Sequence, residues 1–358
     1  MSVSPLEPDS LTAELVSDGL RFGAGGFVRR WVEELASLGE PPPDLRPAPL
    51  EPDDAAALLD RLGVAEVAAL DVIATLPSAD RTPEWWWCLE REVYRLASTM
   101  GDPDAPRGSW PSFEGDAHSV DRRCHFVHVA LATVPFTLDY YAKLGVPGEV
   151  VMASLADLAR HMAIHRRVYG STGVDAAWWV TLCLRGEIQD LGCLQYNRFT
   201  LGVGDESPAW FDDAVAERLG PGFRTGDPCL GIHIPDQTPL EPEQVEASLV
   251  AAASHFRQYF PTATRRVATC MSWLLDGQLA EYLPAQSNIV RFQQRFELIP
   301  ASHEGDGSLL QFVFRVTGDK PDLDALPQNT TLERAAVAHM RSGRHWRVRT
   351  GWLDLPEG

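Results

Sequence analysis

The sequence predicts an α+β protein, in which an all-helical N-terminal domain over residues 1–172 precedes a mixed α/β domain over residues 173–358. Three observations predict this fold class. Apolar residues recur at helical spacing throughout the first domain. The pattern changes after Gly170, where strand-like runs begin, and residues 229–275 have the pattern of strand, helix and strand. With 358 residues the chain is long enough for two domains of about 100–200 residues each.

The helices of the first domain carry recognisable start and stop signals. Thr82-Pro83 is an N-cap followed by proline at the first helical position, Pro147 begins another helix, and Gly170 stands where a C-terminal cap belongs. Loops rich in proline and glycine cover residues 39–52 and 101–115. The expected helices are Leu11–Phe22, Phe27–Leu38, Asp53–Leu62, Val64–Leu76, Pro83–Ser98, Val120–Leu144 and Pro147–Tyr169.

The second domain begins less regularly. Ala176–Leu184 fits either a last helix or a first strand, and this alternative stays open. Ile188–Leu201 is expected to be a strand, because residues such as Tyr196 on one face alternate with residues such as Asn197 on the other. A loop-like insertion over residues 202–227 follows.

A strand-helix-strand unit forms the centre of the second domain. In its first strand, which begins at Cys229, side chains alternate between Leu230, Ile232 and Ile234 on one face and Gly231 and His233 on the other. The helix that follows ends before Pro261 and has an apolar stripe that suits packing on a sheet. That stripe consists of Val245, Leu249, Ala252 and Phe256.

The second strand of this unit, Arg266–Leu275, is apolar for nearly its whole length, as expected of a strand buried on both faces. A unit of this kind predicts two parallel strands joined by a right-handed crossover. A broken helical segment over Gln278–Phe296 continues the alternation, and Thr330-Thr-Leu-Glu333 fits a capping box at the start of a helix. The further expected strands are Phe296–Pro300 and Leu309–Val316, joined by a turn-like segment, and His345–Leu355 at the end.

Charge and composition exclude several classes of function. The chain has 31 Lys and Arg against 50 Asp and Glu, a net charge of −19, which argues against nucleic acid as a partner. No apolar stretch approaches the roughly 18 residues of a membrane span, and the N-terminus lacks the pattern of a signal peptide. We therefore expect a cytoplasmic protein. The six cysteines include no C-x-x-C pair and are expected to be reduced and buried.

Several motifs resemble a two-domain family of GNAT-like N-acyltransferases, whose helical N-terminal domain precedes a GNAT-like C-terminal domain. The resemblance covers most of the chain from about residue 64 onward. The residues that carry it are Leu191-Gly-Cys-Leu-Gln-Tyr196, Leu230-Gly-Ile-His-Ile-Pro235, Cys270-Met-Ser-Trp-Leu-Leu-Asp276, Ser287-Asn288 followed by Phe292 and Phe296, and Tyr141-Ala-Lys-Leu-Gly-Val-Pro-Gly-Glu-Val150 in the first domain.

The resemblance implies an acyl-CoA-dependent N-acyltransferase. In the GNAT fold two parallel strands splay apart and acyl-CoA (acetyl-CoA or a longer acyl-CoA) lies in the gap, with a small-molecule amine entering from the opposite side. The pyrophosphate would meet N–H groups where the next helix begins, a favourable place for an anion. The cofactor-binding residues implied in this sequence are Ile232, Ile234, Pro235, Gln237, Thr238 and Asn288.

The sequence departs from the superfamily at the phosphate loop. The superfamily loop is rich in glycine, whereas Gln237-Thr-Pro-Leu-Glu-Pro242 has no glycine and has two prolines without N–H donors. Glu243 and Glu246 also place negative charge where phosphates would bind. One alternative is therefore a catalytically inactive GNAT-fold binding module that does not use CoA.

Amide-forming acyl transfer needs a group that removes a proton from the amine and one that protonates or stabilises the leaving thiolate. His233 is the candidate base, because an imidazole titrates near neutral pH and its strand would line the cleft. Ser272 is a candidate for substrate binding or proton relay, and Tyr282 for the acid. Each also has a structural interpretation, since a strand histidine is often only hydrogen-bonded and a helical tyrosine often only packs. Asp276 is interpreted as the N-cap of the next helical segment.

A second alternative is a metal-dependent hydrolase. His161 and His165 are one helical turn apart, as in zinc peptidases, but Met162 replaces the glutamate of that motif. We therefore expect no metal. The sequence leaves the acceptor, the acyl length and the oligomeric state open.

Overall fold

The computed structural model describes residues 25–111, 113, 118–201, 216–217, 220, 223–261, 267–316 and 321–356. The chain divides into two compact units between Gln189 and Asp190. The sequence analysis placed the domain boundary after residue 172, and the element between the two positions is the helix Ala177–Leu184, which resolves the open alternative there. The expected helix Leu11–Phe22 and most of the insertion at 202–227 lie outside the described residues.

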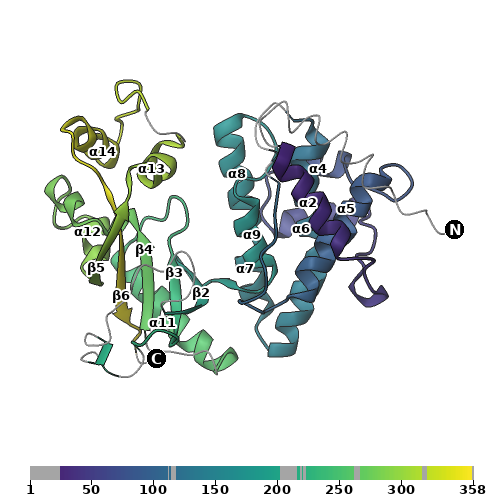
Figure 1. Cartoon of the computed structure of the whole chain (residues 1–358), viewed down its shortest axis with the longest axis horizontal. Coiled ribbons are helices and arrows are strands. Elements are labelled where there is room, and N and C mark those ends of the chain that lie inside the picture. Colours follow the sequence, from purple (N-terminus) through teal and green to yellow (C-terminus); the bar gives the residue numbers. More distant parts are fainter. Residues whose placement is uncertain are drawn as a thin grey trace. The chain divides into compact units, whose positions relative to one another are not determined.

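The first unit consists of helices (Figure 1). The expected helices Pro83–Ser98 and Val120–Leu144 have the predicted bounds, whereas the expected helix Pro147–Tyr169 is two helices that meet at Ala156. The described elements of the first unit are α2 (Gly25–Ser37), the 3₁₀ helix η1 (Pro43–Leu45), α3 (Pro52–Arg61), α4 (Glu66–Ala74), α5 (Pro83–Ser98), α6 (Val120–Leu144), α7 (Gly148–Leu155), α8 (Asp157–Tyr169) and α9 (Ala177–Leu184).

Helix α6 is the central element of this unit. It packs against α3, α4, α5, α7 and α9, and every residue from Cys124 to Val134 is buried, so all its sides are covered there. A helix that is apolar all round belongs in the core of a bundle. Gly145 ends it with φ of 75°, and Gly170 ends α8 with φ of 73°, because glycine adopts the left-handed conformation without steric cost.

The second unit is built on a six-stranded sheet with the strand order β1-β2-β3-β4-β6-β5. The strands are β1 (Ile188–Asp190), which spans the boundary between the units, β2 (Gln195–Thr200), β3 (Pro228–His233), β4 (Val267–Ser272), β5 (Glu297–Glu304) and β6 (Arg347–Asp354). Figure 1 shows β3, β4 and β6 side by side. β3 and β4 are parallel, as predicted, and the pairs β2/β3, β4/β6 and β5/β6 are antiparallel.

β3 and β4 pair through the middle of β3 and the first half of β4. Leu230 pairs with Ala268 and Gly231 with Thr269, and no later β3–β4 pair occurs within these two described strands. Beyond that point β3 remains paired with β2 as far as His233, and β4 remains paired with β6 as far as Ser272. Toward their carboxyl ends these two described strands therefore share no ladder pair with each other, as expected of the splayed pair that the family resemblance implies.

Helix α11 (Pro242–Tyr259) connects β3 to β4. Its predicted apolar stripe is confirmed, because Val245, Leu249, Ala252 and Phe256 are all buried. On β3, Leu230 and Ile232 are buried as well, whereas His233 is half-buried. Cys229 and Gly231 are buried too, so burial does not alternate along β3 and both faces of its centre are covered.

The expected strand Leu309–Val316 is wrong. That segment is a short helix α13 (Asp306–Leu309) followed by a π-helix η4 (Leu310–Phe314). Leu309 and Leu310 are both buried while Phe312 is 53% exposed, and two consecutive buried side chains do not fit the alternation of a strand. The expected strand Arg266–Leu275 also ends early, at Ser272, and continues as a 3₁₀ helix η2 (Trp273–Leu275).

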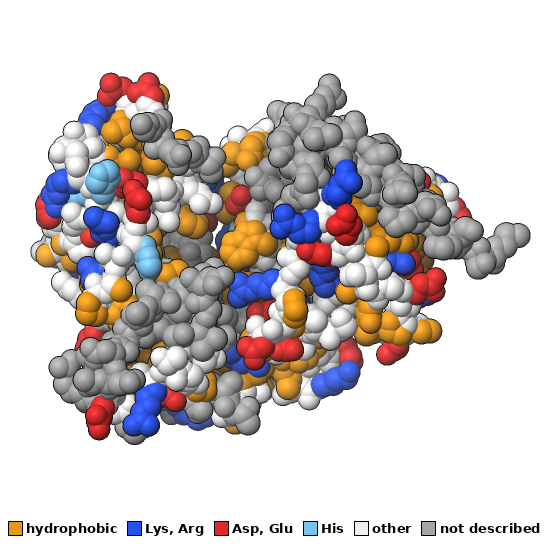
Figure 2. Space-filling model, in the orientation of Figure 1, with side chains coloured by type: hydrophobic (Ala, Val, Ile, Leu, Met, Phe, Trp, Pro, Cys, Tyr) orange, Lys and Arg blue, Asp and Glu red, His pale blue; other side chains and the backbone are white. Residues whose placement is uncertain are grey.

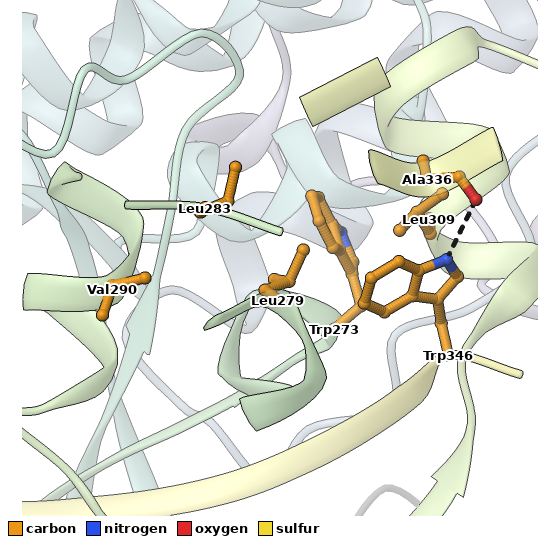
Figure 3. Close-up of a cluster of buried hydrophobic side chains, with 7 residues drawn as sticks. All are labelled: Trp273, Leu279, Leu283, Val290, Leu309, Ala336 and Trp346. Atoms are coloured by element: carbon orange, nitrogen blue, oxygen red, sulfur yellow. Dashed lines mark hydrogen bonds between the residues drawn. The ribbon is translucent and has the colours of Figure 1, made fainter. Parts of the chain in front are cut away.

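Short helices connect the last strands of the sheet. These are the 3₁₀ helix η3 (Gly277–Glu281), α12 (Asn288–Gln293) and α14 (Thr331–Arg341), and the predicted capping box of Thr330 and Glu333 is present at the start of α14. Figure 3 shows Trp273 and Trp346 close to each other, with Leu279 beside Trp273 and with Leu309 and Ala336 beside Trp346, all within one buried cluster. The Trp346 indole N–H donates to the Ala336 carbonyl at 3.4 Å.

The surface is charged but mixed. Among the described side chains on the face drawn in Figure 2, acidic and basic groups are interspersed. All six cysteines are free thiols, and only Cys193 is not fully buried. None of the helices in the described part of the chain is long and apolar enough to cross a membrane.

Candidate active site

His233 lies at the end of β3, at the point where β3 and β4 have separated. Its Nε2 atom is 2.9 Å from the Asn197 Oδ1 atom on the neighbouring strand β2. Asn197 is 9% exposed, so this contact is largely shielded from water. The candidate base thus lies two residues beyond the last β3–β4 pair and contacts a neutral amide.

A second buried amide lies on the same face of the sheet. Gln195 is directly opposite His233 in the β2–β3 register and is 2% exposed. Its Nε2 atom has no hydrogen-bond partner among the described residues, which is unusual for a buried donor. Neither Gln195 nor Asn197 was predicted to be functional from the sequence. Gln195 belongs to the motif Leu191–Tyr196, and the two residues share one face of an expected strand.

The loop after β3 contains two unusual backbone conformations. The Thr238 N–H donates to the Pro235 carbonyl at 3.2 Å, which closes a turn. Gln237 has φ of 59° and Leu240 has φ of 54°, left-handed values that non-glycine residues adopt at some cost. Gln237 therefore has, without being glycine, the conformation that glycine commonly provides in such turns.

Arg315 contacts this loop through an ion pair with Asp236. The Arg315 side chain is 17% exposed and that of Asp236 16%, so the pair is mostly buried. Arg315 itself has φ of 57° and ends the π-helix η4. The sequence analysis missed Arg315, because it interpreted its segment as a strand.

The first turns of α11 carry the expected acidic side chains. Arg295 donates to Glu246 at 2.6 Å and to the Pro242 carbonyl at 3.0 Å. An open pocket of about 710 Å³ lies along this part of α11, and Glu243 and Val250 also line it. The carboxylate of Glu246 is thus neutralised by Arg295 beside the beginning of the helix.

Asn288 joins α12 to the same loop. Its side-chain amide donates to the Pro239 carbonyl at 2.9 Å. The N-cap of α12 is the neighbouring residue Ser287, whose hydroxyl accepts from the Val290 N–H at 3.4 Å. The structure therefore brings Asn288 and the loop containing Gln237 together.

Comparisons with known proteins decide the family. A family model described as an N-acyltransferase N-terminal domain matches residues 53–186, and one described as a GNAT-like C-terminal domain matches residues 188–353. The chain belongs to the two-domain GNAT-like N-acyltransferases. The resemblance found in the sequence motifs is therefore confirmed.

Solved structures similar to this acyltransferase cover nearly its whole length. It is 36% identical to an acyltransferase in complex with decanoyl-CoA and teicoplanin, covering 98% of this chain and 100% of that one with a TM-score of 0.81. A mutant acyltransferase in complex with octanoyl-CoA is 35% identical, with the same coverage and TM-score. A search of curated proteins found no match. The full-length matches show that the chain is an enzyme that transfers acyl groups.

Ser272 in the acyltransferase caps a helix. Its hydroxyl accepts from the Leu274 N–H at 3.1 Å at the beginning of η2. Asp276 caps η3 in the same way, accepting from the Gln278 N–H at 3.0 Å, as predicted. The hydroxyl proton of Ser272 is not engaged by this capping bond.

Tyr282 lies in the packed cluster near α14. Its hydroxyl is 3.1 Å from the His339 Nδ1 atom, and its ring contacts the rings of His339 and Trp346. The contacts observed for Tyr282 are thus with α14 and the segment before β6. Its role as an acid remains a prediction.

His161 and His165 of the acyltransferase are engaged by different groups. His165 is fully buried, with Nδ1 3.0 Å from the Ser171 carbonyl. His161 lies between the carboxylates of Asp157 and Asp175, at 3.6 and 3.7 Å. Burial lowers the pKa of His161, but the two carboxylates outweigh it and raise this pKa to about 9.

Proposed function

We propose that the protein transfers an acyl group of octanoyl or decanoyl length from acyl-CoA to the amine of a teicoplanin-like small-molecule acceptor. The support for the acyl donor and the acceptor is the full-length similarity to acyltransferases in complex with these acyl-CoA molecules and with teicoplanin. The support within the chain is the separation of β3 from β4, with His233 at its mouth.

In this proposal His233 is the general base. The amine nitrogen attacks the thioester carbonyl carbon, a C–N bond forms and the C–S bond breaks. His233 takes the proton that the nitrogen loses, and the sulfur leaves as the CoA thiolate, which is then protonated. The Ser272 hydroxyl at the end of β4 would donate its proton to this thiolate and regain one from the protonated His233, since its capping bond uses only an oxygen lone pair. Such proton transfer contributes about 10²–10⁴-fold to a rate.

The acyl-CoA arm would run along β3 beyond Gly231, the last residue of that strand that pairs with β4. The backbone groups at Ile232 and Ile234 would pair with the pantetheine amides, and Pro235 would direct the chain into the phosphate loop. The left-handed conformation of Gln237 supports a turn of the kind that binds phosphate. The Thr238 N–H already donates to the Pro235 carbonyl, so Thr238 would contact the pyrophosphate through its hydroxyl group.

Arg315 would supply the positive charge that the loop sequence lacks. It contacts the loop through Asp236, and Asn288 fixes the same loop to α12. The alternative of a module that does not bind CoA rests on the negative charges of Glu243 and Glu246, which lie where phosphates would bind. The neutralisation of Glu246 by Arg295 weakens that alternative.

The function is tested by incubating the purified protein with acetyl-CoA, octanoyl-CoA or decanoyl-CoA and teicoplanin stripped of its acyl chain. Release of free CoA thiol and the mass of the product are measured. We expect turnover with the two longer acyl-CoA molecules to exceed turnover with acetyl-CoA, and a product heavier by one acyl group. No thiol release with any acyl-CoA, from folded protein, would contradict the proposal.

A further inference from the structure

We propose that Asn197 is a positioning residue that fixes the tautomer of His233, and that Gly231 is required for it to do so. This inference rests on the proposed role of His233 as general base. The contact that carries it joins Asn197 Oδ1 and His233 Nε2 at 2.9 Å. The two residues are 36 positions apart and meet because β2 and β3 are antiparallel neighbours.

The strand register places Asn197 diagonally across from His233. Asn197 pairs with Gly231, and Gln195 pairs with His233, so all four residues point to one face of the sheet. Diagonal neighbours of this kind are about 7–8 Å apart at the backbone, within reach of longer side chains. The asparagine amide spans this distance by passing over Gly231.

The absence of a side chain at position 231 makes room for the amide. A β-carbon built on Gly231 would overlap the Asn197 Oδ1 atom, and it would lie 3.3 Å from Asn197 Cγ and 3.4 Å from His233 Nε2. Gly231 does not have a positive φ, so its conformation does not require glycine. The requirement is the close approach of a neighbouring side chain, a known reason for glycine inside a strand.

The chemistry of the amide determines the tautomer. An amide oxygen only accepts hydrogen bonds, so a contact with Oδ1 requires the proton of the neutral imidazole to be on Nε2. The basic lone pair is then on Nδ1, the atom we assign to proton removal. Because an amide carries no charge, it orients the ring and favours the imidazolium ion much less than a carboxylate would.

The test combines ¹⁵N NMR of histidine-labelled protein with steady-state kinetics. The His233 ring signals are assigned by comparison with a His233→Gln sample. In the natural protein we expect His233 to have its proton on Nε2. In Asn197→Ala and in Gly231→Ala we expect a mixture of tautomers, together with a kcat lower by about tenfold or more and a nearly unchanged KM for acyl-CoA.

Two control variants match these substitutions. Asn329→Ala removes an exposed amide, and Gly277→Ala adds a β-carbon that would meet nothing within 4 Å. Both are expected to leave the His233 signals and kcat unchanged, and the thermal unfolding midpoint of every variant shows whether it is folded. If the Asn197 carboxamide had only a structural role, Asn197→Ala would change the thermal unfolding midpoint but not the tautomer of His233.

The outcomes separate this inference from the proposed function. A proton on Nδ1 in the natural protein, or a tautomer or kcat that does not respond to Asn197→Ala, would overturn the positioning role. If His233→Gln keeps full turnover, the assignment of the base is wrong, even where the tautomer behaves as expected. If the natural protein transfers no acyl group, the proposed function fails, while the NMR measurement still decides whether Asn197 fixes the tautomer.

Discussion

The His233 imidazole is the residue on which the proposed chemistry depends most. Replacing it with glutamine keeps a polar side chain of similar size but removes the base. We expect kcat to fall by about 10²–10⁴-fold, because this is the usual contribution of a general base. Binding of acyl-CoA, followed by thermal shift, should be unchanged. A variant that turns over at the natural rate would exclude His233 as the base.

Arg315 is predicted to bind the phosphates of acyl-CoA. Arg315→Gln should raise the KM for acyl-CoA by about tenfold or more, since hydrogen bonds to charged groups contribute about 1.5–3 kcal/mol and 1.4 kcal/mol is tenfold. Asp236→Asn should have the opposite effect, because it removes the carboxylate that competes for Arg315.

Arg341→Gln is the matched control for this prediction. Arg341 forms an ion pair with the exposed carboxylate of Asp324, and the Arg341 side chain is itself 44% exposed. Its removal should leave the KM for acyl-CoA unchanged. Equal KM values for the Arg315 and Arg341 variants would show that Arg315 does not contact the donor.

Tyr282 distinguishes a packing role from an acid role. Tyr282→Phe keeps the ring but leaves the buried Nδ1 atom of His339 without its partner. We expect unfolding free energy to fall by about 1 kcal/mol and kcat to change by less than about twofold. Urea denaturation and steady-state kinetics measure the two quantities. A loss of kcat without a loss of stability would instead support the acid.

At the scale of elements, helix α8 should make the stability of the first unit depend on pH. The pKa of His161 is raised from 6.5 to about 9 by Asp157 and Asp175, after burial has lowered it. A raised pKa stabilises the folded state fully below about pH 6.5, and this contribution is lost as the pH rises through about 9. Its size is on the order of 3 kcal/mol.

His161→Gln tests this pH dependence. The variant should be less stable than the natural protein at pH 6 and should approach it above pH 9, as measured by thermal unfolding across that range. His303→Gln, which removes an exposed imidazole of β5, serves as the control. A constant difference between His161→Gln and the natural protein at every pH would contradict the assigned pKa.

The elements that could be predicted from the sequence are those with strong local signals. Pro83 at the first helical position marks the beginning of α5, and Gly145 and Gly170 end α6 and α8. The strand predicted over Leu309–Val316 is wrong because a short apolar segment fits helix and strand equally well. Its neighbours in space decided the outcome, since Leu310 packs against Val337 of α14.

The candidate site was predictable only in part, for a related reason. His233 could be identified as a titratable residue on an expected strand. Its contact with Asn197 could not, because it joins residues 36 positions apart through the strand register. The Asp236–Arg315 pair joins residues 79 apart and depends on a π-helix that periodicity does not indicate. Contacts between distant segments follow from the tertiary fold and not from local pattern.

At the scale of the whole molecule, both domain models match in sequence order, and the similar solved structures are covered almost completely. The protein therefore has the full two-domain architecture of an acyltransferase. The loop Gln237–Pro242, which is proposed to bind the phosphates of acyl-CoA, contains no glycine. Whether this loop binds CoA is the question on which the proposed function depends.

The measurement that tests the central claim most directly is a thermal-shift titration of the natural protein with decanoyl-CoA, free CoA and, as a polyanion control, ATP. At about 100 times its dissociation constant, a ligand stabilises the native state by about 2.7 kcal/mol, which should raise the unfolding midpoint of a unit of this size by about 5 °C or more. We predict such a shift with decanoyl-CoA and a smaller one or none with ATP. No shift with decanoyl-CoA or CoA, on protein shown to be folded, would contradict the account.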